Sequence, residues 1–164
     1  MSSTNQPHTQ TSGKGKSGVQ AIPKGYHSVT PYLVIDGAKK VIDFLKKAFD
    51  AQQVTLMPGD SPDKVGHAEM KIGDSIIMIG DAMADMKATP TMLYLYVEDA
   101  DATFKRAKQA GGTVVKDIEN QFYGDRAGCL KDPSGNLWWI ASHVEEVTPD
   151  ELKRRHDAMT KTKH

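Results

Sequence analysis

The side chains whose types and spacing best fit acid–base or metal chemistry are His67 and Glu69. They lie two residues apart in a segment that alternates apolar and polar residues, so in a strand both point to one face, together with Lys71. An imidazole beside a carboxylate can act as a general base or supply two ligands to a metal ion. Two ligands are too few for a tight metal site, and a solvated or ion-paired strand face explains the same pattern. Both interpretations stay open.

A second polar group lies in residues 121–126, QFYGDR. The guanidinium of Arg126 carries a planar fork of donors that could bind an anionic or carbonyl group of a ligand, with Gln121 and Tyr123 beside it. Alternatively, Asp125 and Arg126 form an ion pair that stabilises a hairpin. The residue types support these two hypotheses about equally.

The elements that would position these residues belong to an internal sequence repeat. Residues 30–49, TPYLVIDGAKKVIDFLKKAF, return in degraded form at residues 91–110, TMLYLYVEDADATFKRAKQA. Each copy indicates a strand, a tight acidic turn and an amphipathic helix. In the first copy, apolar residues such as Val41 and Leu45 recur at three- and four-residue steps, which gives the helix one apolar face. Each copy is therefore predicted to be a strand followed by a helix whose apolar face packs on another layer of the protein.

Three further strands follow each copy, separated by turn signals such as the proline- and glycine-rich segments 58–63 and 132–135. The alternation of apolar residues predicts them at 52–57, 65–72 and 75–79, and again at 113–118, 122–132 and 136–142. The chain is thus predicted to be an α+β protein of two tandem β-α-β-β-β modules, module one at 26–80 and module two at 91–143.

The sequence on either side of the modules is polar. Residues 1–24 contain almost no apolar side chain, so they are predicted to form a disordered tail before a domain at 25–147. At 148–151 the sequence TPDE has a capping residue, a proline at the first helical position and an acid three residues after the cap. This pattern predicts a C-terminal helix over 148–160.

The composition limits partners and location. Lys plus Arg and Asp plus Glu both number 21, so no net charge would recruit nucleic acid or a membrane surface, and no apolar run is long enough to span a bilayer. The single cysteine, Cys129, cannot form an internal disulfide, and we expect it to be a buried, inert thiol. Because the start of the chain carries no apolar signal segment, we expect a cytoplasmic protein that binds neither nucleic acid nor membrane.

Two tandem modules closed by a DPxGxxW strand resemble the vicinal oxygen chelate superfamily, the glyoxalase and bleomycin-resistance proteins, and within it the PhnB-like subgroup. The resemblance covers about residues 26 to 151 and is carried by TPYLVIDGAKKVIDFLKKAF, HAEMKIGDSIIMIGD, LYLYVEDADATFKRAKQAGG and QFYGDRAGCLKDPSGNLWWIASHVEEV. It implies that each module's sheet curls around a cavity while its helix packs on the outer face. It also implies that two modules close a cup, within one chain or across a homodimer.

Metal-dependent members of this superfamily carry His, Gln or Glu ligands on the first and last strand of each module. By the resemblance, these positions are here Thr30, either Ile77 or Met78, Met92 and Trp139, and none is a competent ligand. The resemblance therefore implies no metal ion and no other cofactor at this site. It argues against glyoxalase, dioxygenase or thiol-transferase chemistry there.

Aromatic residues are expected to line the cup, with Trp139 in the cavity and Trp138 beneath a helix. Tyrosine and tryptophan combine apolar contact with hydrogen-bonding groups, as in many small-molecule pockets. The predicted ligand-binding residues are Thr30, Tyr32, Met92, Tyr94, Tyr96, Gln121, Arg126 and Trp139.

The favoured hypothesis is a metal-free protein that binds a small aromatic or amphipathic molecule, in its concrete form by sequestering a toxic or antibiotic compound. The alternative is a metal-dependent lyase- or dioxygenase-like enzyme that uses a displaced site around His67 and Glu69. A third hypothesis is that the protein has no ligand and that its own side chains fill the cup.

Overall fold

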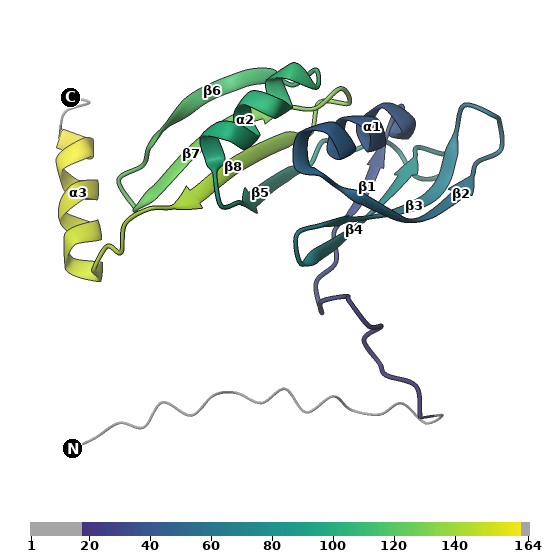
Figure 1. Ribbon diagram of the computed structural model, residues 1–164, viewed down its shortest axis with the longest axis horizontal. Helices are drawn as coiled ribbons and strands as arrows, with labels where there is room; N and C mark the ends of the chain where they lie inside the picture. The colour runs from purple at the N-terminus through teal and green to yellow at the C-terminus, as the bar shows by residue number, and fades with distance from the viewer. Residues whose placement is uncertain (1–17, 162–164) are drawn as a thin grey trace.

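The computed structural model describes residues 18–161 (Figure 1). Of the predicted tail, residues 1–24, the first 17 lie outside the described residues. Residues 18–24 are described and are exposed. In chain order the elements are β1 (Tyr32–Ile35), α1 (Ala38–Phe49), β2 (Gln52–Pro58), β3 (Val65–Ile72), β4 (Ser75–Asp81), β5 (Met92–Tyr96), α2 (Ala100–Gln109), β6 (Thr113–Asn120), β7 (Asp125–Lys131), β8 (Leu137–His143) and α3 (Pro149–Lys161). Both modules therefore have the predicted β-α-β-β-β order.

Each module forms its own mixed four-stranded sheet. The strand orders are β1-β4-β3-β2 and β5-β8-β7-β6, in which the first and last strands of a module run parallel and the other neighbours run antiparallel. The registers also correspond, since Tyr32 pairs with Met78 in the first sheet and Tyr94 pairs with Trp139 in the second. This repeated topology confirms the predicted α+β class and the tandem modules.

One hydrophobic core runs beneath both helices. Figure 1 shows α1 and α2 next to each other on the same side of the two sheets, and the helices contact each other. Leu33 and Ile35 are buried under α1, as their alternation with Tyr32 predicts. The ring of Trp138 lies beneath the helices with its centroid 5.0 Å from that of Phe49, so the two modules share a core.

The last strand of each module holds the start of that module's helix. The buried carboxylate of Asp81 accepts hydrogen bonds from the backbone N–H groups of Gly37 (2.9 Å), Ala38 (3.2 Å) and Val65 (2.7 Å). Burial alone would raise the pKa of Asp81, but these bonds outweigh it and lower the pKa below its usual value. In module two, the Ser142 hydroxyl takes the corresponding place and accepts from the Ala100 N–H at 2.9 Å.

The third helix, α3, projects beyond the second sheet (Figure 1), and none of its residues is buried. Arg155 ties it to module two, because its guanidinium donates to Glu145 (2.6 Å) and to the carbonyl of Phe122 (3.2 Å), and to Glu151 within the helix (2.7 Å). Among the helices of residues 18–161, none combines the length and the apolar character that crossing a membrane requires.

Candidate functional site

The side of each sheet that faces away from α1 and α2 is uncovered in the single chain. We call these surfaces the module-one face, comprising Tyr32, His67, Glu69 and Met78, and the module-two face, comprising Tyr94, Tyr96, Asp125, Trp139 and His143. Tyr32, Tyr94 and Tyr96 are 46%, 43% and 62% exposed. Large aromatic side chains gathered on an open surface are typical of a binding site or an interface.

The module-two face is organised around Asp125, which is only 3% exposed. One carboxylate oxygen of Asp125 accepts hydrogen bonds from the hydroxyls of Tyr94 and Tyr96, each at 2.9 Å. The other accepts from Nδ1 of His143 at 2.8 Å. The hydroxyl of Tyr123 lies 3.2 Å from that of Tyr94 and extends the network. A buried carboxylate with three donors fixes the orientation of two phenol rings and one imidazole.

The network fixes charge states as well as orientation. Burial alone would raise the pKa of Asp125, but the hydrogen bonds from His143, Tyr96 and Tyr94 outweigh it and hold that pKa below its usual value. The hydrogen bond to Asp125 in turn raises the pKa of His143 and of Tyr96. Burial, with Tyr123 and Asp125 close by, raises the pKa of Tyr94. At neutral pH the carboxylate is therefore ionised and both phenols keep their protons.

The rings of this face form a continuous surface, which we call the aromatic strip: Tyr96, Tyr94 and Trp139. Tyr94 and Trp139 are almost parallel, with an interplanar angle of 10° and centroids 6.1 Å apart, and the Tyr94 and Tyr96 centroids lie 5.2 Å apart. The ammonium of Lys116 lies 5.7 Å from the centroid of the Trp139 ring. Since the tyrosine hydroxyls donate to Asp125, the ring surfaces are what the strip offers to a ligand.

The module-one face carries a polar cluster instead. Nδ1 of His67 lies 3.2 Å from the Tyr32 hydroxyl, and Nε2 lies 3.4 Å from a carboxylate oxygen of Glu69. A hydrogen bond from Tyr26, ahead of β1, lowers the pKa of Glu69 below its usual value. Both ring nitrogens of His67 thus have partners inside the protein. Among residues 18–161, no three His, Cys, Asp or Glu side chains gather as a metal ion would need.

The residues at the family's metal-ligand positions do not form a donor set for a divalent ion. Met78, not Ile77, lies on the open face, because Met78 pairs with Tyr32 while Ile77 packs into the core. The hydroxyl of Thr30 donates to the carbonyl of His27 at 3.0 Å. Two thioethers, an indole and an engaged hydroxyl do not replace the nitrogen and oxygen ligands that such an ion needs. The side chains present therefore do not fit a metal at these positions.

The predicted place of Arg126 in the cup is wrong. Its guanidinium lies on the helix side of the second sheet and donates to both carboxylate oxygens of Asp101, at 2.5 and 2.6 Å, and to Asn120 at 3.2 Å. Neighbouring residues of a strand point to opposite faces, so Arg126 points away when Asp125 points toward the tyrosines. For the same reason, the alternative ion pair between Asp125 and Arg126 does not form.

Of the other predicted ligand-binding residues, Tyr32, Met92, Tyr94, Tyr96 and Trp139 lie on the open faces, and Met92 is 67% exposed. Gln121 lies beside Lys116, from which its side-chain oxygen accepts at 3.4 Å, and its amide donates to the carbonyls of Glu119 and Ala127.

The central role of Asp125 was not predicted from the sequence. Two signals in the sequence point to it. The alternation that puts Arg126 on the helix side of the sheet puts Asp125 on the open face, and the same alternation puts His143 on the face of Trp139. What joins them is the register of β7 and β8, in which Asp125 lies directly opposite His143. Cys129 is buried on the same face opposite Trp139, and burial raises the pKa of its thiol, which keeps it unreactive.

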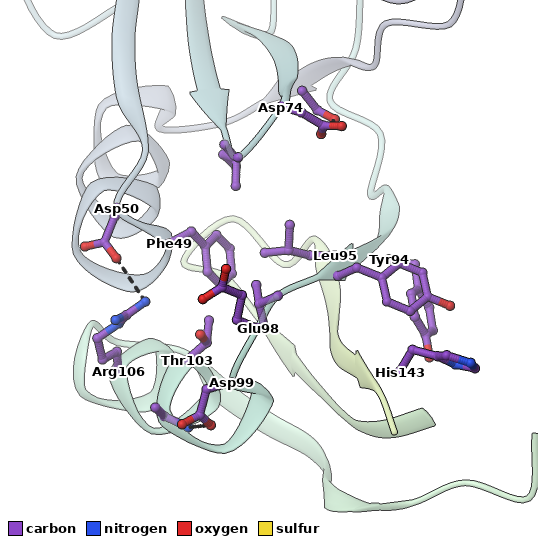
Figure 2. Close-up of a pocket in the computed structure, with 16 residues that line it drawn as sticks. Phe49, Asp50, Asp74, Tyr94, Leu95, Glu98, Asp99, Thr103, Arg106 and His143 are labelled. Carbon is purple, nitrogen blue, oxygen red and sulfur yellow. Dashed lines mark hydrogen bonds and ion pairs between the residues drawn. The ribbon is translucent and has the colours of Figure 1, made fainter. Parts of the chain in front are cut away.

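A cavity of about 900 Å³ lies at the free edge of β5, between the two modules. Figure 2 shows Tyr94 and His143 close together on one side of it, and the ion pair of Asp50 with Arg106, at 3.0 Å, on the other. Strand β5 passes between these groups, and Leu95 points into the space that they enclose. The module-two face is thus continuous with a groove along the junction of the modules.

Comparison with known proteins identifies a family for this chain. The sequence profile of the Glyoxalase/Bleomycin resistance protein/Dioxygenase superfamily matches residues 26–140. The uncharacterized proteins Rv0887c of Mycobacterium tuberculosis (strain H37Rv) and Mb0911c of Mycobacterium bovis are each 39% identical to this chain over 138 residues. The match covers 77% of this chain, 80% of the first protein and 90% of the second.

Solved structures with the same fold include TioX from Micromonospora sp. ML1, with a TM-score of 0.61 at 21% identity, covering 72% of this chain and 99% of TioX. TnmS3, an antibiotic binding protein from Streptomyces sp. CB03234, has a TM-score of 0.59 at 21% identity. The superposition covers 75% of this chain and 98% of the TnmS3 chain. A PhnB protein from Bacillus cereus has a TM-score of 0.57 at 22% identity, covering 71% and 99%. At these identities the likeness extends to the fold.

Proposed function

Since the chain belongs to the Glyoxalase/Bleomycin resistance protein/Dioxygenase superfamily, as its repeat predicts, we propose that it is a metal-free protein that binds small aromatic or amphipathic molecules. The observation that carries the proposal is the aromatic strip of Tyr94, Tyr96 and Trp139, in which the buried Asp125 orients the two tyrosine rings and Trp139 stacks on Tyr94. Rings held in place before binding lose little conformational entropy when a flat ligand packs on them. Side chains at the family's metal positions that do not fit an ion favour binding over metal-dependent chemistry.

A cup needs a second wall, and we propose that a second copy of this chain supplies it. Each chain offers one module-one face and one module-two face, so a two-fold dimer that pairs unlike faces closes two equivalent cups. Pairing would also cover exposed rings such as Tyr32 and Tyr96, which are unfavourable in contact with water. Tyr32, His67 and Glu69 of one copy would then lie across the cup from the aromatic strip of the other.

The physiological role that we propose is sequestration of a toxic or antibiotic compound. TnmS3 is an antibiotic binding protein of the same fold, and a chain without a metal site can protect by binding alone. The enzyme alternative relies on His67 and Glu69, whose side chains lie 3.4 Å apart, with the Tyr32 hydroxyl 3.2 Å from the other ring nitrogen. Among residues 18–161, no third His, Cys, Asp or Glu side chain joins them to complete a metal site.

The test screens planar aromatic compounds, including aromatic antibiotics, by thermal shift and then titrates the best compounds by calorimetry. In parallel, the protein is incubated with nickel, zinc, manganese and iron and its metal content is measured. We expect saturable binding of at least one aromatic compound and no ion retained stoichiometrically. Retention of one ion per chain that His67→Ala removes, without binding of any aromatic compound, would contradict the proposal and support the enzyme alternative.

A further inference from the structure

His143 has one ring nitrogen inside the Asp125 network and one outside it. Nδ1 donates to the buried carboxylate at 2.8 Å, so the proton of a neutral imidazole lies on Nδ1 and Nε2 is an acceptor. The His143 side chain is 47% exposed. Nε2 lies 3.5 Å from an oxygen of Glu146, a side chain that is 97% exposed, and this distance is too long for a strong hydrogen bond. Nε2 is therefore accessible to a ligand.

The charged and titratable groups around His143 come from three elements. Asp125 faces it from β7, Tyr94 and Tyr96 lie beside it from β5 through their shared bonds to Asp125, and Glu146 follows β8. The two phenols already donate hydrogen bonds to Asp125, and this buried carboxylate accepts three hydrogen bonds in all. On this part of the module-two face, a ligand can thus reach the imidazole nitrogen, which is a stronger base than the exposed carboxylate of Glu146 beside it.

The position of His143 matches the aromatic strip. Trp139, Ala141 and His143 alternate along β8 on one face, and four residues of strand span roughly 13 Å. The ring of Tyr96 lies between them, opposite Ala141. Figure 2 shows His143 next to the ring of Tyr94 at the edge of the cavity. A flat ligand that packs on Tyr94 and Tyr96 would bring a ring substituent to Nε2.

We propose that His143, positioned by Asp125, accepts the proton of an acidic hydroxyl group on an aromatic ligand, so that the cup selects phenols and related acids and holds them as anions. The ligand O–H bond breaks, the Nε2–H bond forms, and the phenolate remains beside the imidazolium, whose charge Asp125 balances. No further reactant takes part. The inference rests on the proposed binding function and adds the chemical class of its ligand.

The test compares 4-nitrophenol with 4-nitroanisole, which keeps the ring and the nitro group but carries a methyl group in place of the acidic proton. Binding of each to the full chain is measured by calorimetry across pH, because folding raises the pKa of His143 and the imidazole accepts a proton only where it is still neutral. Ionisation of bound 4-nitrophenol is followed by the visible absorption of its phenolate. We expect 4-nitrophenol to bind about tenfold more tightly than 4-nitroanisole, since a charge-assisted hydrogen bond is gained. Its ionisation midpoint should shift to lower pH in the complex.

His143→Gln should abolish both the preference and the shift, so that the variant binds 4-nitrophenol and 4-nitroanisole with equal affinity. His156→Gln is the matched control, since it makes the same change in the exposed helix α3, and should behave like the wild type. The inference is overturned if the wild type binds both compounds equally or if His143→Gln keeps the preference. In those cases the binding of 4-nitroanisole leaves the proposed function intact, whereas failure of both compounds to bind would overturn the two together.

Discussion

The module-one face and the module-two face share one backbone plan and carry different chemistry. In both, the tyrosine of the first strand pairs with a residue of the last strand, Met78 for Tyr32 and Trp139 for Tyr94. On module one, the imidazole of His67 is held between two partners of its own face. On module two, Nδ1 of His143 is bound to the buried Asp125, while Nε2 lies 3.5 Å from Glu146, a side chain that is 97% exposed. A repeated topology thus supplies equivalent positions, and the residue types there determine whether a face satisfies itself or binds something else.

The place of the carboxylate makes the difference. Glu69 lies in the middle of β3, paired with Met78, and its side chain is 17% exposed. Asp125 lies at the start of β7, opposite the end of β8, and is 3% exposed. A carboxylate in that place accepts from β5 and β8 at once, which orients the two tyrosines of the aromatic strip and His143. The four predictions that follow test this contrast.

The largest expected difference is in stability. Asp125→Ala leaves two phenols and an imidazole without their shared acceptor, and we expect it to lower the free energy of unfolding by about 3 kcal/mol. Glu69→Ala removes a more exposed carboxylate, and we expect a loss of about 1 kcal/mol. Urea unfolding of both variants measures the difference. Equal losses would show that the two faces are equivalent in energy and would contradict the contrast.

The next difference is in ligand binding. Trp139→Leu removes one ring of the aromatic strip and should weaken binding of a planar aromatic ligand about tenfold, whereas Met78→Leu, the matched change on module one, should weaken it less than about threefold. Calorimetric titration with the tightest compound of the aromatic panel checks both. A larger loss of affinity in Met78→Leu than in Trp139→Leu would indicate that the ligand binds to the module-one face and would contradict the prediction.

A smaller effect is expected in the pH dependence of stability. The pKa of His143 is raised by folding, so its contribution is complete below about pH 6.5, the usual value of a histidine, and is lost as pH rises through the folded pKa. The pKa of Asp125 is lowered, so its contribution is complete above about pH 3.9, the usual value of an aspartate, and is lost as pH falls through the folded pKa.

The stability deficit of His143→Gln should therefore be largest between about pH 4 and 6.5 and shrink at higher pH, as measured by thermal unfolding across pH. In an Asp125→Asn background, the stability deficit caused by His143→Gln should no longer show this pH dependence, because the charged partner of His143 is absent. An identical profile in both backgrounds would show that the pair is not coupled.

The smallest effect is expected on the helix side of module two. Arg126→Gln breaks a partly exposed ion pair with Asp101, and solvent screening weakens such pairs. Stability should fall less than in the Asp125→Ala and Glu69→Ala variants, and the affinity for an aromatic ligand should not change. A loss of binding in calorimetric titration would mean that Arg126 reaches the ligand after all.

The fold could be predicted because its signals are local and repeated. Alternation in residues 32–35 separates the core side chains Leu33 and Ile35 from Tyr32, and the repeat shows that the same separation applies to Tyr94 and Tyr96. The adjacent tryptophans must point to opposite faces, and the structure has Trp138 in the core and Trp139 on the open face.

The site was less predictable because it depends on register between strands. Ile77 and Met78 are both apolar, so only the pairing with Tyr32 identifies the one on the open face. Arg126 was placed in the cup by its chemistry, although alternation allows either Arg126 or Asp125 there. The contact of Asp125 with His143 spans 18 residues and depends on the length of the intervening turn, which no pattern within one strand reveals.

The central claim is that the aromatic strip of module two is the ligand-binding surface, and the two tryptophans of the chain allow a direct test. Protein labelled with 5-fluorotryptophan should give two fluorine NMR resonances, one of which Trp139→Phe removes. Titration with the tightest aromatic compound should shift that resonance saturably and leave the resonance of the buried Trp138 almost unchanged. A saturable shift of the Trp138 resonance alone, or saturable binding that moves neither, would contradict the account.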